Sequence, residues 1–218
     1  MLLINLWIVE FTTNKGVSMA WTYTEGDGYY YGHMNSSAGS NWNNVKTYLE
    51  SEGTFSHEAI VAIIANMDHE SYLNPAQGEH GKNMSDQYGY GLVQWTPART
   101  KIVAYAADDP QSRPWYDGDL QMDYLMINAP ATWQKSEAYP YSWSEFKQLN
   151  DYSTATRCFF YNFERGTWHD EIDTYMQYWA DVCYGDTPPA PPTPPPSPTP
   201  VEEDEMLWHA IYLSKMLR

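Results

Sequence analysis

One long apolar segment constrains the fold of this chain more than any other feature. In AIVAIIANMDHESYLNP, residues 59–75, apolar side chains recur at helical spacing from Ile60 to Met67, and an Asn-Pro pair ends the pattern. The next position on the same face is Glu70. A carboxylate at a core position is costly unless it has partners, which makes Glu70 a candidate catalytic acid. The alternative is that Glu70 begins a loop and points into water.

Two features of this position raise the pKa of an acid. Burial beside the apolar stripe disfavours the charged form, and the C-terminal end of a helix carries negative partial charge. The hydroxyl of the neighbouring Ser71 can orient the carboxyl group of Glu70. A carboxylic acid that keeps its proton near neutral pH can protonate a glycosidic oxygen, as glycosidases require.

Helical patterns dominate the rest of the chain, and a Gly-, Asn- and Asp-rich excursion over residues 72–93 predicts a loop or short hairpin. We therefore expect a mainly α fold, or an α+β fold with a small hairpin. Its architecture is predicted to be a helical bundle around the helix that carries Glu70. The predicted helices span residues 41–52, 56–69, 97–108, 119–127, 142–149, 154–163 and 171–182.

Composition divides the chain into four parts. The sequence TPPAPPTPPPSPTP predicts a polyproline II linker of about 3 Å per residue, or about 40 Å in all. The acidic, amphipathic stretch after it is too short for a domain and is either an interaction helix or the stump of a longer module. We hypothesise that translation starts at Met19, which makes residues 1–18 an over-called start. The predicted parts are an N-terminal arm (1–40), a globular domain (41–186), the linker (187–200) and a tail (201–218).

Charge and cysteine content exclude several classes of protein. The formal net charge of −16 argues against nucleic acid or an anionic membrane surface as a partner. No segment reaches transmembrane length, and the apolar start lacks the basic region of a signal peptide. Cys158 and Cys183 are predicted to be free thiols, because their heights on consecutive antiparallel helices do not match.

The histidines are scattered, and no metal-ligand spacing is present. We therefore expect no metal and no other cofactor. The histidines interpreted as surface or cleft-rim residues are His57, His69, His80 and His169.

A glycine-punctuated stretch follows the apolar helix. In YGYGLVQWTPAR, residues 88–99, two glycines allow tight backbone geometry. The amide of Gln94 can hydrogen-bond a sugar, and Tyr90 and Trp95 offer flat faces for sugar rings. The alternative is a turn that places Leu92 and Trp95 in the core.

The order of these motifs resembles the phage tail lysozyme family, which is related to goose-type lysozymes and soluble lytic transglycosylases. The motifs NVKTYLESEG, IIANMDHESYLNP, YGYGLVQWTPAR, DLQMDYL and ATRCFFYNFERG carry the resemblance, which covers about residues 41–184. It implies a lysozyme-like catalytic domain that cleaves MurNAc–GlcNAc strands of bacterial peptidoglycan. By position, Glu70 matches the catalytic glutamate and Gln94 the glutamine that lines the cleft. Glu164 and Arg165 match a late motif that flanks the site, although a structural ion pair is the alternative for them.

A hydrolase of this kind can use a second carboxylate. Glu79 and Asp86 lie on the loop between the two motifs, and Asp86 is the first choice, although both are otherwise solvated loop acids. If neither serves, the enzyme is a lytic transglycosylase, in which a hydroxyl of the sugar itself attacks. A non-catalytic tail protein that grips glycan is the alternative outside the enzymes.

The resemblance also bears on where the protein acts. Phage proteins are made in the host cytoplasm, and this one is expected to act at the bacterial cell wall, either released at lysis as an endolysin or carried in a virion. The endolysin is slightly favoured. A phage tail or wall-binding partner for the C-terminal tail is the remaining expectation.

Overall fold

A computed structural model describes residues 19–22, 40–80, 82 and 85–187. Most of the predicted arm, almost all of the linker and the whole tail lie outside the described residues, as do residues 1–18. The elements are α1 (Asn41–Ser51), α2 (His57–Ser71), the 3-10 turn η1 (Ala98–Thr100), α3 (Ile102–Ala107), α4 (Gly118–Thr132), α5 (Trp143–Phe146), α6 (Tyr152–Phe159), the π-helical turn η2 (Phe160–Glu164) and α7 (Glu171–Tyr184).

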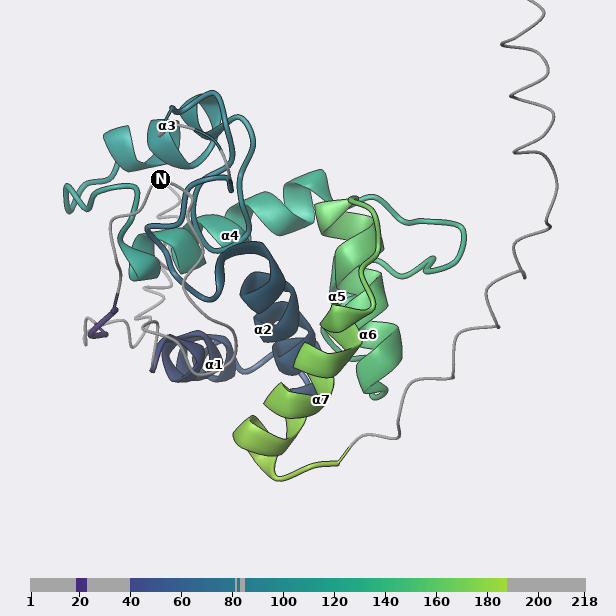
Figure 1. Cartoon of the computed structure of the whole chain (residues 1–218). Coiled ribbons are helices and arrows are strands. Elements are labelled where there is room, and N and C mark those ends of the chain that lie inside the picture. Colours follow the sequence, from purple (N-terminus) through teal and green to yellow (C-terminus); the bar gives the residue numbers. More distant parts are fainter. Residues whose placement is uncertain (1–18, 23–39, 81, 83–84, 188–218) are drawn as a thin grey trace, which may run out of the picture.

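Helix α2 is the centre of the fold (Figure 1). Its residues from Ala59 to Asp68 are all buried, because α1, α6 and α7 pack around it. The hydroxyl of Ser56 accepts a hydrogen bond from the backbone N–H of Ala59 and caps the helix. A helix that is apolar on most of its faces belongs in the interior, and this explains why the segment dominates the sequence pattern.

The predicted mainly α fold is confirmed, and its details differ in several elements. The helix predicted over residues 142–149 is shortened to α5, and the one predicted over 154–163 divides into α6 and η2. The segment after Pro97 divides into η1 and α3, because Lys101 (φ −122°, ψ −104°) breaks the helical path. Helix α4 continues to Thr132, five residues beyond the predicted end at residue 127. In its described part, the excursion over residues 72–93 contains an isolated bridge between Gly78 and Tyr90 and forms no regular strand hairpin.

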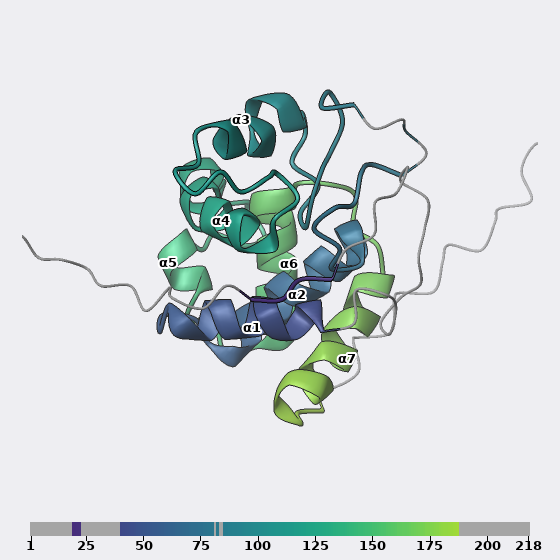
Figure 2. The ribbon, with the colours of Figure 1, turned by 90° about the vertical axis from the view of Figure 1, so that its left-hand side faces the viewer.

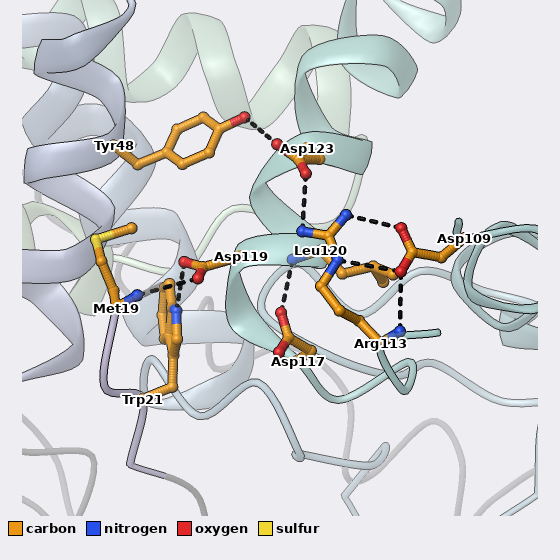
Figure 3. A network of polar contacts seen from close by, with 9 residues as sticks. All are labelled: Met19, Trp21, Tyr48, Asp109, Arg113, Asp117, Asp119, Leu120 and Asp123. Atoms are coloured by element: carbon orange, nitrogen blue, oxygen red, sulfur yellow. Dashed lines mark hydrogen bonds and ion pairs between the residues drawn. The ribbon is translucent and has the colours of Figure 1, made fainter. Parts of the chain in front are cut away.

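Residues 19–22 lie along α1 and contact the start of α4 (Figures 2 and 3). The carboxylate of Asp119 accepts hydrogen bonds from the backbone N–H of Met19, at 3.1 Å, and from the indole N–H of Trp21, at 2.8 Å. Gly118 lies so close to the Trp21 ring that a Cβ would overlap it. This short segment therefore packs onto the domain that begins at α1.

Two further expectations concern the thiols and the membrane. Cys158 and Cys183 are both free, as predicted, and burial raises the pKa of each thiol to about 12. In the described part of the chain, no helix combines the length and the apolar character needed to cross a bilayer.

Candidate active site

A cavity of about 480 Å³ lies among the C-terminal end of α2, the loop that follows it, α4 and η2. Its walls combine three carboxyl groups and two cationic groups with apolar side chains. A cavity of this size suits a small molecule or part of a chain molecule better than a protein surface. The ionisable residues that line it are Glu70, Glu79, His80, Lys101, Glu164 and Arg165.

Glu70 reaches the cavity from the last turn of α2. The chain leaves this helix through two successive left-handed residues, Tyr72 (φ 55°) and Leu73 (φ 57°). The turn ends the helix at Ser71, directly after Glu70. Burial raises the pKa of Glu70 from 4.5 to about 7, so its carboxyl group can hold a proton and release it near neutral pH.

Glu164 approaches the same cavity from the end of η2. Its Oε1 atom is buried and has no hydrogen-bond partner among the described residues. Burial raises the pKa of Glu164 well above the usual value, and the nearby charge of Glu70 raises it further. Because the two carboxyl groups interact, they titrate as a pair, and ionising both near neutral pH is unfavourable.

Two cations at the cavity act in the opposite direction. Lys101 and Arg165 each lower the pKa of Glu164, but by less than burial raises it. The pKa of Lys101 is itself lowered, mainly by burial and then by the charge of Arg165. Among the described residues no ion pair joins Glu164 to Arg165, so the structural pair considered as an alternative is absent there.

The glycine-punctuated loop holds Gln94 in the cavity wall. Gln94 adopts a left-handed backbone (φ 48°), and its amide N–H groups donate to the carbonyl of Gly91, at 3.0 Å, and of Gln77, at 3.2 Å. A Cβ at Gly89 would lie 3.0 Å from the backbone oxygen of Gln94 and 3.1 Å from its side-chain oxygen. Glycine at this position therefore lets the loop close tightly around Gln94.

Trp95 belongs to the cavity wall and to the core at once. Only 3% of the residue is exposed, and its indole N–H donates to Asn128 of α4 at 3.2 Å. Tyr90 does not line the cavity and stacks on Trp115 at 4.5 Å between ring centroids. The structure therefore brings Trp95 to the cavity and leaves Tyr90 in the core.

Ser71 is also turned away from the cavity. It is fully buried, and its hydroxyl oxygen lies 2.9 Å from the carbonyl oxygens of both Met67 and Leu92. The contact with Leu92 joins the end of α2 to the glycine-punctuated loop. Ser71 thus fixes the loop beside Glu70 and does not orient the carboxyl group directly.

The two loop acids differ in position. Glu79 lines the cavity, and its carboxylate accepts a hydrogen bond from the backbone N–H of Gly89 at 3.1 Å. Asp86 does not line it and binds the guanidinium of Arg99 through both carboxylate oxygens, at 3.0 and 3.1 Å. Asp86 is the acid that the sequence favours as the second carboxylate, and the structure places Glu79, not Asp86, at the cavity.

Several lining residues were missed in the sequence. Lys101 and the α4 residues Asn128 and Thr132 lie at the cavity, although their local patterns indicate only helix starts and helix faces. Phe163 was included in a predicted helix without a role, and it forms part of the apolar wall. No local signal distinguishes these residues, because only the tertiary arrangement of segments far apart in the sequence brings them to the cavity.

Comparison with known proteins points to one family. The family described as phage tail lysozyme matches residues 40–185, a range that contains the whole cavity lining. Morphogenesis protein 1 of Bacillus phage B103 is 30% identical over 89 residues, which are 41% of this chain. The matched stretch covers 24% of that relative, so the comparison spans about a quarter of its length.

Proposed function

The chain belongs to the phage tail lysozyme family, and on this basis we propose that it is a muramidase that cleaves the glycan strands of bacterial peptidoglycan. Glu70 acts as the general acid. The observation that carries the proposal is a carboxyl group that faces a cavity and whose pKa burial raises to about 7. A carboxylic acid in this state can protonate the oxygen that leaves when the bond between MurNAc and GlcNAc breaks.

The neighbouring carboxyl group helps to keep a proton in the cavity. Because Glu70 and Glu164 interact, loss of a proton from one makes loss from the other less favourable. Glu70 transfers the proton, since it lines the cavity from the last turn of α2 and matches the catalytic glutamate of the family by position. Glu164 is the last residue of η2. The charge of Lys101 lowers its pKa, and its own protonation state is linked to that of Glu70.

Glu79 is the proposed second carboxylate. In a lysozyme mechanism this group stabilises the cation-like transition state or activates the attacking water. Glu79 lines the cavity, and no cationic side chain among the described residues forms an ion pair with it. Gln94 is proposed to bind the sugar next to the cleaved bond, with Trp95 as the apolar wall behind it.

The test is digestion of purified peptidoglycan by the wild-type chain and by Glu70→Gln. The substitution keeps the shape of the side chain and removes the proton, so the initial rate should fall about 10²–10⁴-fold. Glu58→Gln is the matched control, because Glu58 lies in the first turn of the same helix and outside the cavity. Equal rates for Glu70→Gln and wild type would overturn the assignment of the acid.

Mass spectrometry of the released fragments distinguishes the alternatives. Fragments that have gained water support a muramidase. Anhydro fragments instead identify a lytic transglycosylase, in which Glu79 needs no role as a base. Binding without any cleavage by the wild-type chain would identify a glycan-binding protein and reject the enzyme.

We further propose that the enzyme is carried in the virion, in place of the endolysin role that the sequence slightly favoured. Its family is described as phage tail lysozyme, and the relative in phage B103 is a morphogenesis protein. Mass spectrometry of purified virions should detect peptides of the 40–185 region. Their absence from virions, together with their presence in lysates, would support the endolysin instead.

A further inference from the structure

A second group of polar side chains lies outside the cavity, where the last turn of α2 meets the start of α7. It contains His69, His169 and Glu171, and each can offer one ligand atom such that the three atoms lie within 4.8 Å of one another. The two imidazole rings are 4.9 Å apart between centroids. Nδ1 of His69 lies 3.5 Å from Oε1 of Glu171.

The donor types match those of a zinc site with three protein ligands. In a tetrahedral site with Zn–N bonds of about 2.0–2.1 Å, neighbouring ligand atoms are roughly 3.3 Å apart. The His69–Glu171 distance of 3.5 Å is already close to that value. His169 and Glu171 are exposed, so small rotations of their side chains can bring the third ligand atom into place.

We propose that His69, His169 and Glu171 bind Zn²⁺, with water in the fourth position. Two imidazole nitrogens and one carboxylate oxygen form a ligand set that zinc uses in proteins, whereas Mg²⁺ and Ca²⁺ prefer oxygen ligands alone. The sequence did not reveal the site, because His69 and His169 are separated by about a hundred residues and no short spacing links them.

The ion would join two segments that carry acids of the cavity. His69 directly precedes Glu70 at the end of α2, and His169 lies in the connection that leads from Glu164 to α7. Zinc would therefore hold this connection against α2. The site is separate from the cavity lining, and its occupancy can be measured without any assay of glycan cleavage.

Isothermal titration of the metal-free full chain with Zn²⁺ tests the proposal. We expect binding of one ion that Mg²⁺ at the same concentration does not reproduce. The melting temperature should rise by about 5–10 °C when free Zn²⁺ is a hundred times its dissociation constant. Absence of Zn²⁺ binding would overturn the proposal.

Variants locate the ion. His169→Ala and Glu171→Gln each remove one exposed ligand and should weaken Zn²⁺ binding at least tenfold, while the melting temperature without metal changes little. His57→Ala is the control, because His57 lies at the opposite end of α2, roughly 18 Å away along the helix axis. Unchanged affinity in His169→Ala, or an equal loss in His57→Ala, would place the ion elsewhere and reject this site.

Discussion

The polar network beside α4 and the cavity at the end of α2 both contain carboxyl groups, but the atoms around those groups differ. In the network, Asp109 accepts hydrogen bonds from the backbone and guanidinium N–H groups of Arg113, at 2.8–3.2 Å (Figure 3). Asp123 accepts from the same guanidinium at 2.9 Å and from the hydroxyl of Tyr48 at 2.7 Å. The Arg113 guanidinium holds the pKa of Asp109 below its usual value.

For Glu70 and Glu164 in the cavity, burial has a larger effect on the pKa than any hydrogen-bond donor or cation. The pKa of Glu70 rises to about 7 and that of Glu164 rises well above its usual value, in both cases chiefly because of burial. Oε1 of Glu164 has no partner among the described residues. Donors therefore stabilise the charged form of Asp109 and Asp123, whereas at Glu70 and Glu164 burial in a cavity favours the protonated form.

Asp68 shows that burial alone does not define the site. It is 1% exposed, and burial raises its pKa to about 6, although the indole N–H of Trp179 donates to it at 2.9 Å and lowers the pKa in part. This acid belongs to α2 and faces Trp179 of α7, and it does not line the cavity. A raised pKa is therefore informative only together with access to substrate.

The largest effect expected from this comparison concerns the two loop acids. Glu79→Gln should lower the rate of peptidoglycan cleavage by about 10²-fold or more, because it removes the proposed second catalytic carboxylate. Asp86→Asn should leave the rate within a factor of about two, since Asp86 is paired with Arg99 outside the cavity. Initial rates of turbidity loss measure both. A large loss in Asp86→Asn alone would break the comparison and restore Asp86 as the catalytic partner.

Breaking the polar network should lower the free energy of unfolding and leave the rate of cleavage unchanged. Arg113→Met leaves the carboxylates of Asp109 and Asp123 without their cation, and we expect the free energy of unfolding to fall by about 3 kcal/mol. Arg99→Met is the matched control, because it breaks the exposed pair with Asp86 and should change stability little. Urea unfolding of the three proteins gives the comparison, and equal losses in both variants would contradict it.

The pH dependence of stability should distinguish the cavity from the network. The pKa of Glu70 is raised in the folded state, so its contribution to stability is fully present below pH 4.5 and is lost as the pH rises through about 7. The shift corresponds to about 3 kcal/mol, and we expect about 2 kcal/mol because the cavity is open to water.

Urea unfolding at pH 4.5, 6 and 8 measures this term as the difference between wild type and Glu70→Gln. Relative to wild type, the variant should become more stable as the pH rises. Glu58→Gln serves again as the control on the same helix. A difference between wild type and Glu70→Gln that does not change with pH would show that Glu70 titrates like an exposed acid.

The smallest effect is expected at the contact between α2 and the glycine-punctuated loop. Ser71→Ala removes a hydroxyl that bridges the carbonyls of Met67 and Leu92, and it should lower the free energy of unfolding by about 1 kcal/mol. Cleavage should continue at nearly the wild-type rate. If the rate instead fell as far as in Glu70→Gln, the result would support a role of Ser71 in orienting the carboxyl group of Glu70, as the sequence indicated.

The central helix, its acidic end and the family can all be read from the sequence alone. These features depend only on neighbouring residues. They are the helical spacing from Ile60 to Met67, the stop at Asn74-Pro75 and the order of short motifs. The same local signals predicted the mainly α fold. They failed where the path depends on packing, as at the break before α3 and at the longer α4.

Which side chains lie together depends on the packing of the folded chain. This packing brings Glu79 and not Asp86 to the cavity, adds Lys101 from a segment with no signal of its own, and sets His169 beside His69. The physical reason is that pKa values and ligand distances depend on burial and on neighbours across space. Residues about a hundred positions apart along the chain acquire those neighbours only when α2 packs against α6 and α7.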